Sequence, residues 1–398
     1  MAECIADQDN QSLNHLISDG KWDYQQVMDQ VGKRTNTFFQ ASGLPDQDIA
    51  LIVDEVGFSK KGKYSACVSR QWLGCLGKQD NGQVAVGLVA SCQHYYSPID
   101  MRLFMPQNWS EDHQRRKKAK IPDRITYQSK PDIALEMIEK AINNGFKFSW
   151  VGFDALYGMN YKLLKTLDQM EVTFMADIRS DARIFFERPN LVVPEKKPGS
   201  RGRKPTKPKP DQPDFQVKAY VEGLTEQDWT LVKFRDGTKK PLQALFHRKV
   251  VWIYDEALAD FLCYTLVVRK DSEGIKYSLT NCMADIERLA YMQGQRYFVE
   301  KSYKEGKNQV GMGDYQVRSW EGFHRHMALS MLALNFIMEQ KKKLKKELPH
   351  ITAEDIRKMI AIMIPDKHTS IGSLWEEIRL KHKYYRKQIW KAKFKYAM

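Results

Sequence analysis

The order of apolar segments between residues 50 and 178 restricts the fold of this 398-residue chain more than any other feature. Three strand patterns come first, and the spacing of apolar residues then predicts a helix, a strand, a helix and a strand. In chain order these segments are Ala50–Val53, Ser65–Trp72, Gln83–Ala90, Lys130–Asn144, Phe148–Phe153, Tyr161–Met170 and Val172–Ile178. Most α/β folds alternate strand and helix from the start, so this order indicates an antiparallel meander that continues into a mixed sheet.

This succession is typical of a ribonuclease H-like domain, and we predict an α/β fold with such a mixed sheet and helices on its faces. Further strand patterns predict a β-rich insertion after the sheet. They are Phe215–Val221, Trp229–Phe234, Gln243–Tyr254, Phe261–Arg269 and Lys276–Thr280. Helical patterns resume at Asp285–Lys307 and Gly322–Lys346, and helical regions are predicted at both ends of the chain.

These patterns divide the chain into regions that we expect to act as domains or parts of domains. Residues 1–45 form a helical N-terminal region, which is a candidate DNA-end-binding module or a structural cap. Residues 46–184 and 285–346 form the two parts of the sheet-bearing domain, and residues 185–284 form a basic loop with the β-rich insertion. Residues 347–398 form a basic helical C-terminal region.

The net charge points to a polyanionic partner. The formal charge is +14, and the cations are concentrated in a few segments. Residues 194–213 hold six prolines and seven Lys or Arg, and residues 381–398 hold seven Lys or Arg without an acid. DNA or RNA is the first candidate, and an anionic membrane surface is the alternative. With no bilayer-length apolar run and no signal-peptide pattern at the start, we expect a soluble intracellular protein.

The cysteines do not indicate a metal centre or a disulfide framework. The sequence contains six cysteines, without CxxC pairs or nearby His ligands. Zinc sites need closely spaced Cys and His ligands, and disulfide-rich chains are short secreted ones. We therefore expect reduced cysteines that pack in the core.

Two aspartates are placed to carry chemistry. Asp54 and Asp154 each follow an apolar strand pattern, where a charged side chain leaves the sheet and faces a crevice at its end. The alternative for each is an Asp that only begins a turn. If the two strands are neighbours, the two carboxylates converge.

A third carboxylate lies in the helical stretch Arg296–Lys307. Arg296, Glu300 and Lys307 fall on one face of that helix. The alternative is an ion pair within the helix between Arg296 and Glu300, four residues apart. Three carboxylates from two strands and one helix can hold two Mg²⁺ or Mn²⁺ ions. Two such ions activate the attacking oxygen and stabilise the leaving oxygen in phosphodiester displacement.

The spacing around Glu300 resembles the signature of a large group of bacterial insertion-sequence DDE transposases. That signature is Tyr, two residues, Arg, three residues, Glu, six residues, Lys. Arg296, Glu300 and Lys307 match it in full, whereas Gln293 stands at the Tyr position and the nearest tyrosine is Tyr291.

The likeness extends over roughly residues 45–340. Residues 54–58 with 60–63 and 77–84 are similar to the first catalytic block of these enzymes, and residues 153–158 are similar to the second. Residues 315–320 with His324 and His326 are similar to the segment after the signature. A β-rich insertion before the Glu-bearing helix is also characteristic of the group.

The resemblance implies a metal-dependent DNA transposase. The implied catalytic and metal-binding triad is Asp54, Asp154 and Glu300, with two Mg²⁺ or Mn²⁺ ions. Arg296 and Lys307 would contact phosphates of the terminal nucleotides. The implied reaction is cut-and-paste transposition, in which the transposon 3′ end is hydrolysed and the freed hydroxyl attacks target DNA. The implied partners are double-stranded DNA, terminal inverted repeats and target DNA, with a dimer on paired ends in the bacterial cytoplasm at the nucleoid.

Several segments outside the triad are candidates for DNA contact. Arg201, Arg203 and Lys204 lie in a loop that resembles the Gly-Arg-Pro core of an AT-hook, except that Lys204 separates Arg203 from the proline. The alternative is a solvated basic linker. Relatives with this signature often pass through a hairpin at the transposon end. Trp229 and Trp252 are candidates to stack on a flipped base there, or core residues of the insertion.

Two other functions are compatible with this sequence. One is a ribonuclease H-like nuclease that cuts without strand transfer. The other is a domesticated DNA-binding protein that has kept the fold without the chemistry, although three intact carboxylates argue against it. His324 and His326 have no Cys or His partner at zinc spacing, so we expect them to be packed or to face DNA.

Overall fold

The computed structural model describes residues 10–195, 203–204, 206–237, 241–348 and 351–363. The chain divides into two compact units, of which the larger is Asp23–Glu339. The smaller combines the segments Met1–Trp22 and Gln340–Met398. It contains helix α1 (Asn10–Ser18) and helix α12 (Ala353–Met363), and the Trp22 indole N–H donates to the Leu16 carbonyl at 2.7 Å.

The larger unit is built on a mixed sheet. The strands of its central part are β1 (Ala50–Ser59), β2 (Ser69–Leu73), β3 (Lys78–Cys92), β4 (Tyr95–Leu103), β5 (Trp150–Phe153) and β6 (Phe174–Ile178). Five of them lie in the order β4-β3-β1-β5-β6, with β1, β5 and β6 mutually parallel and the others antiparallel. This arrangement confirms the predicted α/β class with a ribonuclease H-like core.

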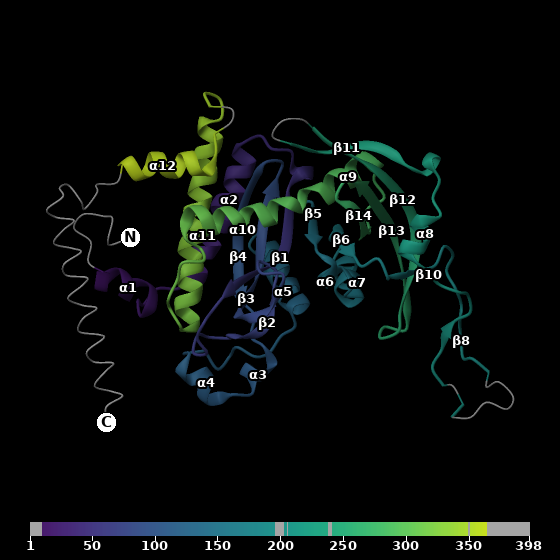
Figure 1. Ribbon diagram of the computed structural model, residues 1–398, viewed down its shortest axis with the longest axis horizontal. Helices are drawn as coiled ribbons and strands as arrows, with labels where there is room; N and C mark the ends of the chain where they lie inside the picture. The colour runs from purple at the N-terminus through teal and green to yellow at the C-terminus, as the bar shows by residue number, and fades with distance from the viewer. Residues whose placement is uncertain (1–9, 196–202, 205, 238–240, 349–350, 364–398) are drawn as a thin grey trace. The chain divides into compact units, whose positions relative to one another are not determined.

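The β-rich insertion continues this sheet. Its long strands are β11 (Thr230–Asp236), β12 (Pro241–Asp255), β13 (Asp260–Asp271) and β14 (Gly274–Thr280). Strand β14 pairs antiparallel with β6, where Tyr277 faces Ile178, so one ten-stranded sheet runs from the core into the insertion (Figure 1). Two small ribbons lie outside it, formed by β7 (Arg183–Ile184) with β10 (Phe215–Gln216) and by β8 (Leu191–Val192) with β9 (Lys209–Pro210).

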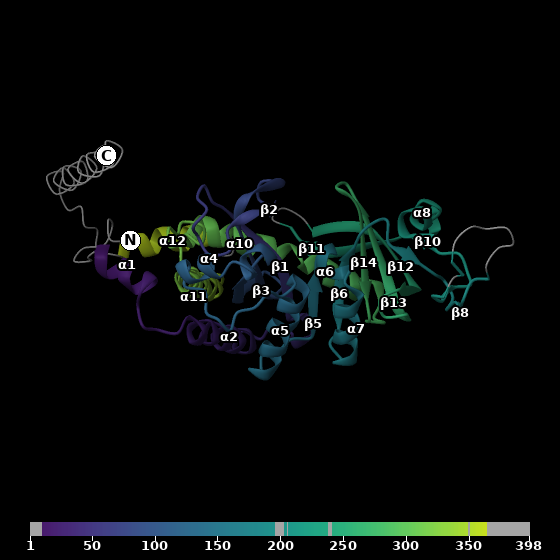
Figure 2. The ribbon, with the colours of Figure 1, turned by 90° about the horizontal axis from the view of Figure 1, so that it is seen from below.

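Helices cover both faces of the sheet. On one face, helices α5 (Lys130–Asn143) and α7 (Tyr161–Gln169) bury their apolar sides in the main core. On the other face run α9 (Ile286–Gln295) and α10 (Tyr297–Val310), as Figure 2 shows. The remaining helices are α2 (Tyr24–Ala41), α3 (Gln107–Ser110), α4 (His113–Lys118), α6 (Ala155–Gly158), α8 (Val217–Glu222) and α11 (Trp320–Leu344).

Local sequence explains α5. The Ser129 side chain accepts a hydrogen bond from the backbone N–H of Asp132, which caps the first turn. Ile133, Met137 and Ala141 then recur at helical spacing and are buried. Among the described helices, none has an apolar stretch of the length and hydropathy that crossing a bilayer requires.

Strand β4 was not predicted, and its sequence shows why. It contains Pro98, which normally argues against a strand because proline has no N–H to donate. Pro98 is tolerated here because β4 pairs on one side only, with β3, and a register shift lies at this point. Leu88 faces Asp100 and Val89 faces Pro98, so the bulge accommodates the proline.

Three further expectations need correction. Phe215–Val221 is a strand for only two residues and then becomes helix α8, because Val217 and Val221 are buried one helical turn apart. The helix expected at Asp285–Lys307 is divided into α9 and α10 at Arg296. Strand β2 begins at Ser69, four residues later than predicted at Ser65.

Candidate active site

The two candidate aspartates come from neighbouring parallel strands. Ile52 of β1 lies opposite Gly152 of β5, so Asp54 and Asp154 are each two residues beyond a paired position. The expectation that their strands are adjacent is confirmed. Asp54 does not end its strand, however. Strand β1 continues to Ser59 because its antiparallel pairing with β3 extends past the end of β5.

Asp54 lies in an environment that opposes its charge. Its side chain is 17% exposed, and its Oδ1 accepts a hydrogen bond from the backbone N–H of Glu55 at 2.7 Å. Burial raises the pKa of Asp54 to about 7. Arg296 works against this rise, whereas the nearby carboxylates of Asp154 and Glu300 add to it. Asp54 therefore ionises less readily in the folded protein than an exposed aspartate does.

Asp154 caps helix α6. Its Oδ1 accepts from the backbone N–H groups of Leu156 at 2.9 Å and Tyr157 at 3.4 Å. Asp154 therefore begins a turn, as the alternative interpretation of this residue expected. It also lies at the same edge of the sheet as Asp54. Burial raises the pKa of Asp154, although Arg296 and the two helix amides oppose the rise.

Arg296 connects the acidic residues. Its guanidinium lies 3.4 Å from Asp54 (Nη1 to Oδ2) and 3.5 Å from Glu300 (Nη2 to Oε1). The ion pair between Arg296 and Glu300 is therefore confirmed. Glu300 is 60% exposed in the first turn of α10, so its carboxylate is open to solvent and to a ligand. Arg296 is partly buried, which disfavours its charge, yet the surrounding acids raise its pKa.

Lys307 lies farther along the same helix and contacts β1. Its Nζ donates to the carbonyl of Gly57 at 2.9 Å, three residues beyond Asp54, and lies 5.1 Å from the ring centroid of Phe58. Burial lowers its pKa. Lys307 thus ties α10 to the strand that carries Asp54.

Asp54, Asp154 and Glu300, together with Asp177, form what we call the acidic cluster. The sequence did not single out Asp177 or the residues that hold it. Asp177 of β6 forms an ion pair with Arg296 Nε at 2.9 Å and accepts a hydrogen bond from the Ser278 hydroxyl at 2.6 Å. Ser278 in turn accepts from Gln293, the residue at the signature Tyr position, at 2.8 Å. An Asp in the middle of a strand pattern carries no local signal, so only the pairing of β14 with β6 brings these residues together.

A cleft opens beside Glu300 between the insertion and helices α9 and α10. Its cavity volume is about 300 Å³. Its cations include Arg235, Arg269 and Lys276, and its aromatic side chains are Phe234 and Tyr297. The Arg235 guanidinium lies 3.6 Å from the ring centroid of Tyr297.

Trp229 and Trp252, the two candidates for base stacking, do not line this cleft. The ring of Trp229 contacts His247, and Trp252 is bridged through its backbone to Phe185. The aromatic side chains that line the cleft are Phe234 and Tyr297.

The predicted loop and histidine residues have different surroundings. Arg203 and Lys204 are exposed, whereas Arg201 lies outside the described residues, as does the C-terminal stretch from residue 364. His324 is packed inside the unit, where its Nδ1 bonds the Trp320 carbonyl at 2.8 Å. His326 bonds the Gly311 carbonyl at 3.0 Å. Both histidines are therefore packed.

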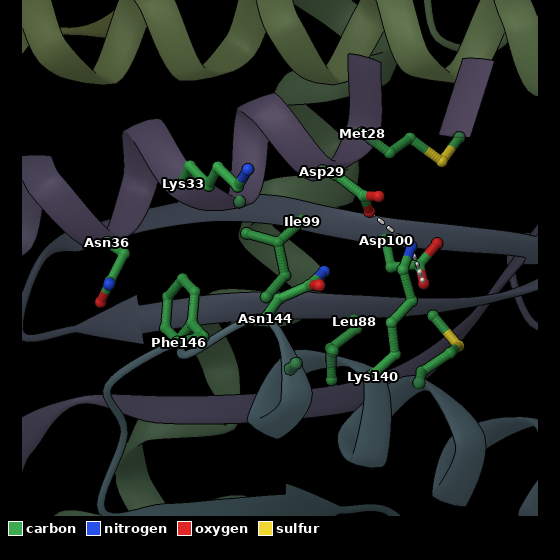
Figure 3. A pocket seen from close by; sticks show the side chains of 13 residues that line it. Met28, Asp29, Lys33, Asn36, Leu88, Ile99, Asp100, Lys140, Asn144 and Phe146 are labelled. Atoms are coloured by element: carbon green, nitrogen blue, oxygen red, sulfur yellow. Dashed lines mark ion pairs between the residues drawn. The ribbon is translucent and has the colours of Figure 1, made fainter. Parts of the chain in front are cut away.

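A second cavity, shown in Figure 3, lies between α2, α5 and the sheet, away from the acidic cluster. Lys140 of α5 points into it and bridges Asp29 of α2 at 2.6 Å and Asp100 of β4 at 3.5 Å. None of the candidate site residues lines it. Its ion pairs join helix α2, from the N-terminal region, to the sheet.

Comparison with known proteins identifies the family. Residues 1–241 match the family described as DDE superfamily endonuclease, which is more than half of the chain. The chain belongs to the DDE superfamily endonuclease family. The match includes Asp54 and Asp154 and ends before Glu300.

A relative of this chain is named as a probable transposase. The chain is 31% identical over 182 residues to the protein from Microchaete diplosiphon named probable transposase for insertion sequence element IS701. The aligned stretch is 46% of this chain and 44% of the relative, so the chain spans less than half the length of that curated relative. The resemblance to insertion-sequence DDE enzymes is thus confirmed at the level of the family.

Proposed function

We propose that this DDE superfamily endonuclease is a DNA transposase that excises an insertion sequence and joins it to target DNA. The main support is the meeting of Asp54 and Asp154 at one edge of the sheet, with Glu300 linked to them through Arg296. The similarity to a probable insertion-sequence transposase favours the same function. The substrate would be double-stranded DNA of the terminal inverted repeats, held by a dimer on paired ends in the bacterial cytoplasm.

The proposed cofactor is a pair of Mg²⁺ or Mn²⁺ ions held by Asp54, Asp154 and Glu300. Carboxylate oxygens are the donors that these ions prefer, and the buried charge of Asp54 calls for a cation. In the described part of the chain, no three His, Cys, Asp or Glu side chains converge closely enough to hold a metal. Arg296 lies between Asp54 and Glu300 instead, so metal binding requires Arg296 to release both carboxylates.

Bound ions would activate the attacking oxygen and stabilise the leaving oxygen of the phosphodiester. The chain's own residues would hold the DNA. Arg296 and Lys307 are proposed to contact terminal phosphates, and the cleft beside Glu300 is proposed to receive the terminal nucleotide. The cations of that cleft suit a phosphate, and Tyr297 and Phe234 suit a base.

A strand-transfer assay with Mg²⁺ tests this function. A duplex that carries the element's terminal repeat should be cut and joined to target DNA by the wild-type chain. The Asp154→Ala and Glu300→Gln variants should bind the duplex and not cut it. Cleavage without joining would instead identify a nuclease, and binding without cleavage would identify a DNA-binding protein. Cleavage by Asp154→Ala at the wild-type rate would exclude the proposed triad.

A further inference from the structure

A hydrogen-bonded chain leads from the insertion to the acidic cluster. Gln293 of α9 donates to the hydroxyl of Ser278 on β14 at 2.8 Å. That hydroxyl donates to Asp177 Oδ1 on β6 at 2.6 Å, and Asp177 Oδ2 forms an ion pair with Arg296 Nε at 2.9 Å. Residues of β6, β14 and α9 thus connect to one guanidinium. We call Gln293, Ser278 and Asp177 the relay.

The relay has a fixed hydrogen-bond direction. Asp177 forms an ion pair with Arg296, and an ionised carboxylate has no proton to donate, so Asp177 accepts from the Ser278 hydroxyl. The Ser278 hydroxyl gives its proton to Asp177 and can then only accept from Gln293. Gln293 is 5% exposed and Ser278 is 0% exposed, so water does not replace these bonds. Buried and fully directed bonds of this kind hold their members in one arrangement.

Arg296 has two sets of acidic partners at different distances. Its ion pair with Asp177 is the shortest of the three, at 2.9 Å, whereas Asp54, which accepts a long hydrogen bond from Nη1, and Glu300 lie at 3.4 and 3.5 Å. The guanidinium reaches Asp177 through Nε and the other two acids through Nη1 and Nη2. Arg296 can therefore lose its contacts with Asp54 and Glu300 while its ion pair with Asp177 stays in place.

We propose that Asp177, held by Ser278 and Gln293, is a positioning residue that keeps Arg296 anchored while a divalent ion takes Asp54 and Glu300. This inference rests on the proposed metal-dependent function. Without the charge of Asp177, Arg296 has only the metal-binding carboxylates as partners and competes with the ion for them. The relay also gives Gln293 a role at the signature Tyr position.

Mn²⁺ binding to the full-length, DNA-free chain tests the relay without an activity readout. Calorimetric titration of the Asp177→Asn variant should give binding roughly tenfold or more weaker than wild type, the size expected for the loss of one partly buried ion pair. In an Arg296→Gln background the same substitution should have no effect, because the competing cation is gone. The matched control is Asp181→Asn, which removes an exposed carboxylate paired with Arg179 and should leave Mn²⁺ affinity unchanged.

The outcomes distinguish the relay from the metal site. Wild-type Mn²⁺ binding that is absent, or that persists in Asp54→Asn, overturns the proposed metal site. If that site holds, the relay is overturned when Asp177→Asn binds Mn²⁺ like wild type, or weakens binding equally with and without Arg296. If Asp177→Asn does not fold, Ser278→Ala replaces it. That variant leaves the charge in place and should weaken binding several-fold, again only when Arg296 is present.

Discussion

The hydroxyl of Tyr303 lies directly over Gly87, the residue of the neighbouring strand β3 that pairs with Asp54. A Cβ atom at position 87 would be 2.2 Å from the Tyr303 oxygen. That hydroxyl donates to the carbonyl of Asp54 at 3.3 Å, and Gly87 is the β3 partner of Asp54 in the strand register. A glycine on β3 thus allows α10 to lie close to the strand that carries the candidate catalytic residue.

Gly87→Ala should displace Tyr303 and destabilise the fold. Tyr303 is buried and cannot swing away, so we expect a loss of about 1–3 kcal/mol in the free energy of unfolding. DNA cleavage should fall because Asp54 and Glu300 no longer hold their spacing. Urea denaturation measures the first effect and a cleavage assay the second. Gly62→Ala is the control, since a Cβ there meets nothing within 4 Å, and equal stability of the two variants would contradict the prediction.

Asp54 should make the metal-free protein less stable as the pH rises. Its pKa is raised from 3.8 to about 7 by burial, so the folded state binds the proton more tightly than the unfolded state does. Relative to Asp54→Asn, the wild-type protein should therefore lose stability as the pH rises from about 4 to about 7, by up to about 1.4 kcal/mol per pH unit. Above about pH 7 the difference between the two proteins should stay constant. Denaturant unfolding with a chelator measures it. A difference that is constant with pH would refute the assignment.

Arg116 should act in folding, although it lies in helix α4, which carries four cations in its last turn. Unlike its neighbours in α4 it is buried, and its guanidinium donates to the carbonyls of Ser110, Pro122 and Ile125. Arg116→Met leaves these carbonyls without their donors and should cost about 2–4 kcal/mol. Lys117→Met, at an exposed position of the same helix, should change stability by less than about 0.5 kcal/mol. Thermal unfolding that does not distinguish the two variants would contradict this role.

The basic loop should contribute to DNA affinity and not to chemistry. Arg203 and Lys204 are exposed, so replacing both with Ala should leave stability unchanged. If they bind phosphates, the slope of log affinity against log salt should become shallower by roughly 1–2. Fluorescence anisotropy at several salt concentrations measures it. If the double variant loses more affinity for A·T-rich duplex than for G·C-rich duplex, the loop binds the minor groove. If the slope is unchanged, the loop is a solvated linker.

The order of strands and helices was predictable because each element carries its own periodicity. The core of β1, the amphipathic α5 and the strand before Asp154 all follow local patterns. Strand β4 was missed because Pro98 argues locally against a strand, and only its one-sided pairing and the bulge make the proline acceptable. Helix α8 was predicted as a strand because residues four apart, such as Val217 and Val221, share one face in a strand and in a helix. The segment is helical, with both side chains buried.

The candidate site was predictable only in part, for a related reason. The i to i+4 spacing of Arg296 and Glu300 is local, so their ion pair could be read from the sequence. Asp177 and Ser278 are 101 residues apart and carry no motif. Their contact depends on β14 extending the sheet next to β6, which is a property of strand pairing and not of either segment.

The sequence by itself predicted the class of fold and the family likeness and singled out three candidate carboxylates, because periodicity and spacing are local properties. Tertiary structure decided how these groups meet. It placed Asp54 and Asp154 on paired neighbouring strands, Arg296 between Asp54 and Glu300, and Gln293 at the start of a buried relay. Such contacts depend on which strands pair and on which charges share a buried site, and residues distant in sequence fix both.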